Sequence, residues 1–311
     1  MEIIRDISAL PQRYRGSVVS IGNFDGVHRG HARIIERLHG LAEKVAGPVV
    51  VFTFDPHPVR ILRPEQVPPP LTWTKRKAEL LSELCVDAMV VYPTDRHILS
   101  LGPQDFFQQI VCQSLSARAL AEGPNFCFGR DRAGNIETLT DLCKVADIPL
   151  QIVEPLLDGG EFISSSRIRK AIHDGHVDDA RRLLTQPYRI RGMVTHGAAR
   201  GAKIGFPTAN LAAIDTLIPA EGVYAGRIIR EDKTYAAAIN VGPNPTFGEH
   251  LDKVEVHVVD FSGNLYGEPL EVDFLSRLRD IHPFEDSESL KRQLGHDVRK
   301  TREIVESSGL R

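Results

Sequence analysis

Two histidines stand three residues apart in a short segment that is rich in glycine. The segment IGNFDGVHRGH, residues 21–31, follows an apolar run and precedes a helical pattern, so it is expected to turn from a strand into a helix. N–H groups at the start of a helix can hold phosphate oxygens. His28 and His31 could therefore face the same bound phosphate, and the interspersed glycines would let the backbone approach a nucleotide closely.

A pair of surface histidines beside a glycine turn is the simpler interpretation of such a spacing. Two observations favour the phosphate site instead. Asn23 and Asp25 crowd into the same turn, which core packing does not explain. A zinc site is disfavoured because no nearby cysteine or third histidine completes a ligand set.

Two later segments have a composition that suits phosphate binding. GPNFCFGRDRAG (residues 123–134) follows a predicted strand and combines glycine, asparagine and arginine. ISSSRIR (residues 163–169) places three hydroxyls and two arginines at a predicted helix start, which can form a phosphate clamp. An ordinary N-cap with solvated arginines is the alternative for ISSSRIR.

A second glycine-rich segment, HGAARGAKIGFPTANL (residues 196–211), lies in the other half of the chain. No Walker A sequence occurs anywhere, which disfavours a P-loop kinase. Thr208 and Asn210 are two residues apart, so on an extended chain they face the same side. A hydroxyl and an amide oxygen suit Mg²⁺, although a glycine-rich turn with side-chain capping fits the same pattern.

The elements that would position these segments differ between the two halves. Up to about residue 184, short β-rich runs alternate with helical patterns, for example a strand over 17–24, a helix over 30–45 and a strand over 48–54. This alternation predicts an α/β domain, Rossmann-like, with a parallel sheet and helices on both faces.

After residue 184 the strand-like runs follow one another directly, separated by turn signals such as EDK and SGN. They predict a small antiparallel barrel. A closing helix is expected near residues 287–308, with Ser287 as its N-cap. The predicted domains are residues 1–186 and 187–311.

Composition narrows the classes of function. The 311 residues carry a net charge of -3, so there is no electrostatic reason to expect a nucleic-acid partner. No apolar run approaches the length of a membrane helix, and the N-terminus shows no secretory signal. The four cysteines form no CxxC pair, which predicts reduced thiols in a cytoplasmic protein. The oligomeric state is left open, a homo-oligomer included.

Taken in order, IGNFDGVHRGH, TFDPHP, GPNFCFG and ISSSRIR resemble the adenylyltransferase half of the bacterial bifunctional riboflavin kinase/FAD synthetase family. The resemblance implies that His28 and His31 contact the phosphates of ATP while the FMN phosphate attacks its α-phosphorus. Asn125 stands where many relatives carry aspartate, and Ser166 stands where they carry threonine. The other residues that it places at this site are Asn23, Asp25, Ser164, Ser165 and Arg167.

GFPTAN, AAAINVGPNPTFGE, VEVHVVDF, NLYGEPLEV and LRDIHPFEDSESL resemble the riboflavin kinase domain, a six-stranded barrel. The resemblance implies that Glu255 is the catalytic base, at the barrel mouth, and that Thr208 and Asn210 hold Mg²⁺ with ATP. Ala202 replaces an arginine that relatives often carry, which leaves Arg200 or Lys203 to supply the charge. The remaining residues assigned to this site are Gly197 and Gly205 on the nucleotide and Arg279 on the flavin side.

The sequence therefore predicts an enzyme that phosphorylates riboflavin to FMN and adenylylates FMN to FAD, with ATP and flavins as substrates and Mg²⁺ as cofactor. Three other hypotheses remain: a single-activity enzyme with one degenerate half, a flavin-binding regulatory or carrier protein that has lost catalysis, and an ATP-binding scaffold. The presence of His28, His31 and Glu255 disfavours the first two. A scaffold would have no reason to hold two unrelated phosphate sites.

Overall fold

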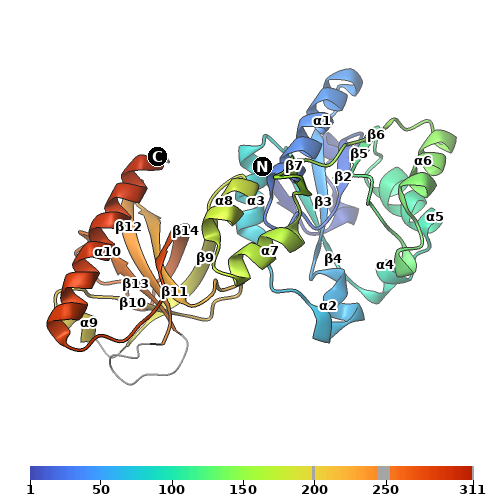
Figure 1. Ribbon diagram of the computed structural model, residues 1–311. Coiled ribbons are helices and arrows are strands. Elements are labelled where there is room, and N and C mark those ends of the chain that lie inside the picture. Colours follow the sequence, from blue (N-terminus) through green and yellow to red (C-terminus); the bar gives the residue numbers. More distant parts are fainter. Residues whose placement is uncertain (198–199, 244–252, 310–311) are drawn as a thin grey trace. The chain divides into compact units, whose positions relative to one another are not determined.

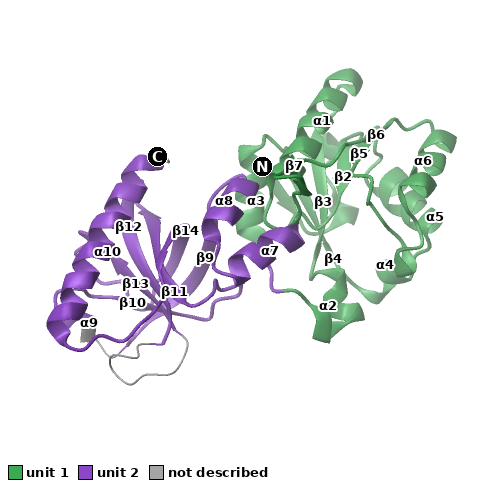
Figure 2. Cartoon of the chain, in the orientation of Figure 1, with its two compact units in different colours: residues 1–68, 74–164 green, residues 69–73, 165–311 purple. Residues whose placement is uncertain are grey.

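The computed structural model describes residues 1–197, 200–243 and 253–309. Their contacts divide the chain into two compact units (Figure 2). The first unit comprises residues 1–68 and 74–164, and the second comprises residues 69–73 and 165–311. The predicted boundary between residues 186 and 187 stays a prediction, because these units follow spatial contacts and not the chain alone.

The first unit is built on a six-stranded parallel sheet in the order β1-β4-β3-β2-β5-β6. This confirms the α/β fold that the alternating pattern predicts. The edge strand β1 was not predicted from the sequence. The strands are β1 (Glu2–Ile4), β2 (Val18–Ile21), β3 (Val49–Asp55), β4 (Ala88–Pro93), β5 (Ala119–Glu122) and β6 (Leu150–Ile152).

Helices cover both faces of this sheet (Figure 1). On one face, Leu38 of α1 (Arg29–Val45) and Leu81 of α3 (Thr74–Glu83) are buried against the strands. The opposite face buries Phe107 and Leu139, from a second set of helices. That set is α5 (Pro103–Phe106), its π-helical continuation (Phe107–Ser114) and α6 (Ile136–Val145). The unit also holds α2 (Pro58–Leu62), α4 (Arg96–Ser100) and the hairpin β7 (Leu157–Asp158)–β8 (Glu161–Phe162).

The strand order reverses beside β2. The chain passes from β2 to β3 on one side, continues to β4, and then crosses to the other side of β2 to form β5. In open α/β sheets, ligands bind outside the carboxyl ends of the strands at such a switch point. The carboxyl ends of β2 and β5 therefore mark the expected ligand site of the first unit.

The second unit contains a closed antiparallel barrel in the order β10-β13-β12-β11-β14-β9. The six-stranded barrel predicted for this half is confirmed. Closure leaves no unpaired strand edge in the sheet. The strands are β9 (Tyr188–Thr195), β10 (Ala209–Ala212), β11 (Gly222–Arg230), β12 (Lys233–Gly242), β13 (Lys253–Val258) and β14 (Pro269–Arg279).

A buried ionic cluster ties three barrel strands together. Asp273 on β14 accepts hydrogen bonds from Arg189 Nε (2.5 Å) on β9 and from Arg227 Nε (2.9 Å) on β11. Asp273 and Arg227 are almost fully buried, at 1% and 4% exposure. One carboxylate thereby links β9, β11 and β14.

Helices accompany the barrel in the second unit: α7 (Ser165–His173), α8 (Val177–Leu183), the short α9 (Arg200–Lys203) and the closing α10 (Ser287–Ser307). The closing helix is confirmed, but the prediction of its N-cap is wrong. Asp286, not Ser287, is the N-cap, and its side chain accepts a hydrogen bond from Ser289 N at 2.7 Å. A carboxylate one residue earlier also has a favourable interaction with the positive end of the helix.

Candidate functional site

The histidine turn lies at the switch point of the parallel sheet. It leaves β2 at Ile21 and enters α1 at Arg29, while the segment 123–129 leaves the neighbouring strand β5. The pairing of β2 with β5 stops at Val19 and Leu120. Beyond this point a side chain replaces the backbone as hydrogen-bond acceptor: Ile21 N donates to Glu122 Oε1 at 2.6 Å. The two strand ends therefore separate beneath the turn.

His28 and His31 cap α1 reciprocally. His31 N donates to His28 Nδ1 and His28 N donates to His31 Nδ1, each at 3.3 Å. The two rings stack with centroids 3.6 Å apart. Because each Nδ1 accepts a hydrogen bond, a neutral ring must carry its proton on Nε2. Both histidines are thereby prepared as Nε2–H donors.

Burial keeps both imidazoles neutral. It lowers the pKa of His28 to about 4, even though Asp25 opposes this change. Burial also lowers the pKa of His31 well below its ordinary value, and His28 and Lys77 lower it further. The protonation state required by the reciprocal cap is therefore the one present near neutral pH.

The backbone of the turn is strained. Phe24 and Val27 have positive φ values of 47° and 40°, which are unusual for an aromatic and a β-branched residue. Gly26, with φ of 82°, is the only one of the three suited to this region. Such strain persists only where the surroundings hold it, and it is concentrated at functional sites.

Gly30 is required at its position by close contacts. A Cβ atom there would lie 3.0 Å from His28 Nδ1 and 3.5 Å from the carbonyl oxygen of Ile163. Any side chain would press on the His28 ring. The same contact shows that the strand end before the serine segment lies beside the histidine turn.

Two residues hold this turn: Lys77, which sequence reasoning missed, and Thr53, which begins the TFDPHP segment. Lys77 on α3 donates from Nζ to the Asn23 carbonyl oxygen at 2.6 Å, and Thr53 Oγ1 donates to the same oxygen at 3.2 Å. The Asn23 amide also lies 2.8 Å from His57 Nε2. His57 Nδ1 in turn accepts from Val59 N at 3.1 Å, so the ring caps the start of α2.

The remaining predicted residues of this site are spread over both units. Asp25 is buried in the histidine turn, whereas Asn125 is exposed in the loop after β5. Ser164 ends the first unit, and Ser165, Ser166 and Arg167 begin α7 in the second. The serine segment does begin a helix, as predicted, and its binding role stays a prediction.

In the barrel, polar side chains align across three neighbouring strands. Asn210 on β10 pairs with Glu255 on β13, and Glu255 pairs in turn with Asn240 on β12. Residues directly opposite one another share a face of the sheet. Asn240 was not singled out in the sequence, where it reads as one more residue of an alternating strand.

This row faces away from the barrel interior. Val254 and Val256 are buried inside, and side chains alternate along β13, so Glu255 lies on the opposite, half-buried face. The expectation that this carboxylate lies at the barrel mouth and acts as the base stays a prediction. Glu255 pairs with Asn210, the predicted magnesium ligand, across the sheet.

Gly197 and Gly205 serve the glycine-rich segment in different ways. A Cβ at Gly197 would lie 2.2 Å from Asn210 Nδ2, so the backbone packs directly on the amide. Gly205 has φ of 92° and ends the turn before the PTAN residues. The segment is also joined to β13, where His257 Nδ1 lies 2.7 Å from the Pro207 carbonyl oxygen.

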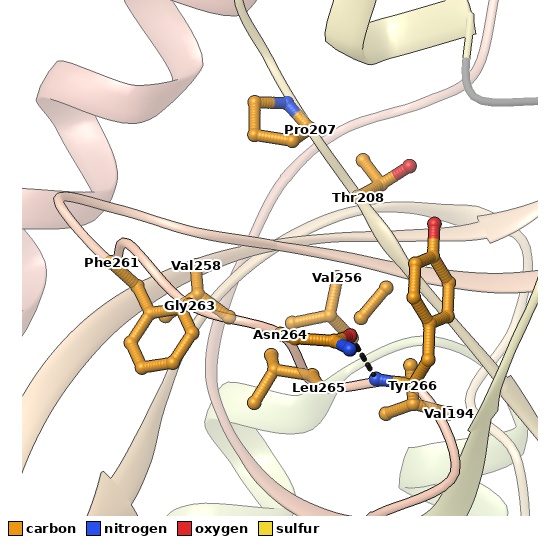
Figure 3. Close-up of a pocket in the computed structure, with 11 residues that line it drawn as sticks. Val194, Pro207, Thr208, Val256, Val258, Phe261, Gly263, Asn264, Leu265 and Tyr266 are labelled. Atoms are coloured by element: carbon orange, nitrogen blue, oxygen red, sulfur yellow. Dashed lines mark hydrogen bonds between the residues drawn. The ribbon is translucent and has the colours of Figure 1, made fainter.

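A pocket of about 180 Å³ opens at the end of the barrel next to Thr208 (Figure 3). Its walls are mainly apolar, and include Val194, Val256 and Val258. Tyr266 stands at its rim, where its ring stacks on His196 with centroids 4.1 Å apart. Thr208 and Asn264 are among the polar residues that line the same pocket.

Arg279 lies at the end of β14, where its guanidinium is bound to the closing helix. Its Nη2 lies 2.9 Å from Asp297 Oδ2, and Gln293 donates to the other carboxylate oxygen at 2.8 Å. Ala202 and Lys203 are exposed in α9. The Arg200 side chain and residues 244–249 of the AAAINVGPNPTFGE segment lie outside the described residues.

Comparisons with known proteins find matches for both halves of the chain. A model of the FAD synthetase family matches residues 10–167, and a riboflavin kinase model matches residues 184–305. The bifunctional riboflavin kinase/FMN adenylyltransferase of Escherichia coli K12 is 33% identical over 98% of both chains. The chain belongs to this bifunctional family. The Pseudomonas fluorescens relative of the same name is 32% identical over the full length of both chains.

A solved structure from Streptococcus pneumoniae, described as a macrolide-efflux protein, is 33% identical. It covers 96% of this chain and 98% of its own, with a TM-score of 0.85. Across the described residues, the helices are all too short or too polar to cross a membrane.

The family assigns the chemistry of the two units. The riboflavin kinase activity converts riboflavin to FMN, and the FMN adenylyltransferase activity converts FMN to FAD. ATP, riboflavin and FMN are the substrates. The single-activity and flavin-binding hypotheses are thereby set aside in favour of the bifunctional enzyme.

Proposed function

We propose that the reciprocal cap of His28 and His31 is the adenylyltransferase centre, with both Nε2–H groups donating to the phosphates of ATP. An oxygen of the FMN phosphate attacks the α-phosphorus, the bond to the β-phosphate oxygen breaks, and pyrophosphate leaves. Neutral donors held in place by the helix start need no rearrangement as charge develops. The observation that carries this proposal is the pair of Nδ1 acceptors, which fixes the donor atoms.

In this proposal Asn23 and Asp25 shape the turn, and Asn125 contacts the nucleotide or flavin from the loop after β5. Ser164, Ser165, Ser166 and Arg167 hold phosphate oxygens with their hydroxyls, helix N–H groups and guanidinium. The location of the histidine turn beside Ile163, one residue before Ser164, supports this assignment.

For the kinase, we assign Glu255 as the base that accepts the proton of the riboflavin 5′-hydroxyl. The hydroxyl oxygen attacks the γ-phosphorus of ATP, and ADP leaves. The apolar pocket next to Thr208 would take the adenine ring, while Gly197 and Gly205 let the backbone follow the phosphates. Arg279 stays a flavin-side residue in this proposal, acting through its pairing with Asp297.

Thr208 and Asn210 would hold Mg²⁺ together with the phosphates of ATP. Among the described residues there is no cluster of three or more histidine, cysteine or carboxylate side chains that could hold a metal ion. The donors present nevertheless suit Mg²⁺, which is commonly held by few protein oxygens and by substrate phosphates. The ion would neutralise phosphate charge, and Asn210, packed on Gly197 beside Glu255, would orient it.

We further propose that the enzyme works in the cytoplasm on small molecules alone. All four cysteines are free thiols, which suits a reducing compartment.

Separate variants test the two centres in one protein. We expect Glu255→Ala to abolish FMN formation and to spare FAD formation from added FMN. His28→Ala with His31→Ala should do the reverse. Because this double variant also removes the helix cap, His28→Asn is the sharper single change, since asparagine caps well but lacks Nε2–H.

The measurement is flavin chromatography over time with riboflavin or FMN, ATP and Mg²⁺. If a folded variant of either centre lost both activities, the assignment of separate centres would be wrong. If His28→Asn made FAD at the normal rate, the role of the histidine cap would be wrong.

A further inference from the structure

Lys77 is a half-buried cation of the adenylyltransferase unit that the proposed mechanism does not yet use. It lies on α3, the helix that covers the same sheet face as α1. Its Nζ donates to the Asn23 carbonyl oxygen at 2.6 Å and lies 3.4 Å from Thr53 Oγ1. One side chain thus connects α3, β3 and the histidine turn.

The bonded atom is the decisive detail. The Asn23 carbonyl belongs to the peptide that enters the strained part of the turn, directly before Phe24 with its φ of 47°. A charge-assisted hydrogen bond to that oxygen fixes the peptide plane. Without it, Phe24 could relax toward an ordinary conformation and carry the start of α1 with it.

Lys77 also acts on the histidines through its charge. His31 is close enough for Lys77 to oppose its protonation, together with burial and His28. Only a neutral His31 keeps the Nδ1 acceptor that His28 N–H requires. The lysine therefore favours the protonation state on which the reciprocal cap depends.

The groups around Lys77 balance this charge. Asp25, in the turn, and Asp55, at the end of β3, favour the charged lysine, whereas burial disfavours it and lowers its pKa. Asp55 is itself held by Thr74 Oγ1 at 2.8 Å. The facing titratable groups are thus His31 on α1, Asp25 in the turn and Asp55 on β3.

We propose that Lys77 is a positioning residue for FMN adenylyl transfer, which holds the Asn23 carbonyl and keeps the two histidine Nε2–H donors aimed at the ATP phosphates. The inference rests on the proposed roles of His28 and His31. It assigns Lys77 no contact with substrate.

The test is Lys77→Met, which fills the same space without the ammonium group. We expect kcat of FAD formation from FMN to fall by about 10- to 100-fold, as for a reacting group misplaced by an ångström. KM for ATP should change little. Riboflavin kinase activity, measured on the same sample, should be unchanged.

The pH profile separates positioning from a merely structural role. Removing the cation leaves Asp25 and Asp55 uncompensated, so the pKa of His31 must rise. The acid limb of the adenylyl-transfer profile should therefore move to higher pH in Lys77→Met. The FMN phosphate titrates identically in both proteins, so the difference belongs to the enzyme.

Two further variants complete the design. Lys75→Met is the matched control, because Lys75 lies on the same helix with 76% of its side chain exposed; it should leave rate and profile unchanged. Lys77→Arg keeps a cation and should return the acid limb to its original position, even at a lower kcat. If Lys77→Met does not fold, the acid limb and kcat of Lys77→Arg still test the role of the cation.

Three results would overturn the inference. They are FAD formation within about 2-fold of the original rate, a lower kcat with an unmoved acid limb, or a raised KM for ATP at unchanged kcat, which would indicate substrate contact. If His28→Asn is inactive while Lys77→Met is normal, only this inference fails. If His28→Asn is active, the proposed function itself fails.

Discussion

At the scale of single residues, the histidine turn shows how catalysis and local structure share the same atoms. His28 Nδ1 is an acceptor for the helix, and its Nε2 is thereby left as a donor for substrate. These two hydrogen-bonding roles depend on the orientation of the His28 ring. Gly30 allows that orientation because it has no Cβ atom to press on the ring.

Gly30→Ala should therefore impair adenylyl transfer specifically. The new methyl would lie 3.0 Å from His28 Nδ1 and would tilt the ring. We expect kcat of FAD formation to fall by about 10- to 100-fold, with riboflavin kinase activity unchanged in the same assay.

Gly40→Ala is the control for this change, because a Cβ at that position of α1 meets nothing within 4 Å. It should leave both activities intact and stabilise the helix by about 0.5–1 kcal/mol, measured by denaturant unfolding. Equal activity of the two alanine variants would rule out a steric role for Gly30.

Glu122 is another residue whose role the sequence did not reveal. It ends an apolar run, ALAE, and reads as the polar end of a strand. In the structure it is buried at 3% exposure and accepts from Ile21 N, and burial raises its pKa well above the ordinary value. Its placement depends on β5 lying next to β2, which no local pattern reveals.

At the scale of elements, the barrel depends on the pairing of charges inside its wall. Asp273 is the shared partner of Arg189 and Arg227, which come from the two strands that flank β14. The attraction within such a cluster is offset by desolvation, so we expect its main effect to be on which strand register is stable.

Asp273→Asn should destabilise the barrel strongly, because it removes the buried carboxylate that Arg189 and Arg227 share. We expect a loss of about 3–5 kcal/mol in the free energy of unfolding of the second unit. Denaturant unfolding would measure this loss, and kinase activity at rising temperature would provide a second measurement.

Glu268→Gln provides the comparison on the surface. Glu268 pairs with Arg230 at 2.5 Å, but their side chains are 44% and 31% exposed, so about 0–1 kcal/mol should be lost. If Asp273→Asn cost no more than Glu268→Gln, the buried cluster would have no role in holding the register.

The sequence predicted the elements better than the contacts between them. Apolar periodicity was enough for α1 and for the strands beside it, because buried faces impose that period on the residues. The same reliance on apolar periodicity missed Lys77, because in TKRKAELLSEL it looks like one of several basic residues on the solvent side of a helix. Its hydrogen-bond acceptor is Asn23 in the turn after β2, 54 residues away.

At the scale of the whole molecule, contacts do not follow the two activities neatly along the chain. Residues 69–73, from the half that carries the FAD synthetase match, belong to the second unit. Leu217 N donates to the Pro70 carbonyl oxygen at 3.0 Å, and the Arg191 guanidinium lies 4.8 Å from the centre of the Trp73 ring.

A fragment of residues 1–186 should therefore expose its tryptophan. Trp73 is the single tryptophan of the chain and is buried at 6% exposure, and the fragment lacks both Arg191 and Leu217. We expect its fluorescence emission to shift to longer wavelength relative to the intact protein, toward that of the chain in denaturant.

Emission unchanged from the intact protein would show that residues 69–73 stay packed without the barrel. It would also support residues 1–186 as an independent domain, as the sequence predicted.

The reciprocal histidine cap affects how a duplicated copy of this protein would evolve. A copy of the chain released from making FAD would still be selected to fold, and folding alone needs only some cap at the start of α1. Serine, aspartate or asparagine at position 28 would serve that need. Replacement of His28 by one of these residues would thus mark a copy that has given up adenylyl transfer while its first unit stays folded.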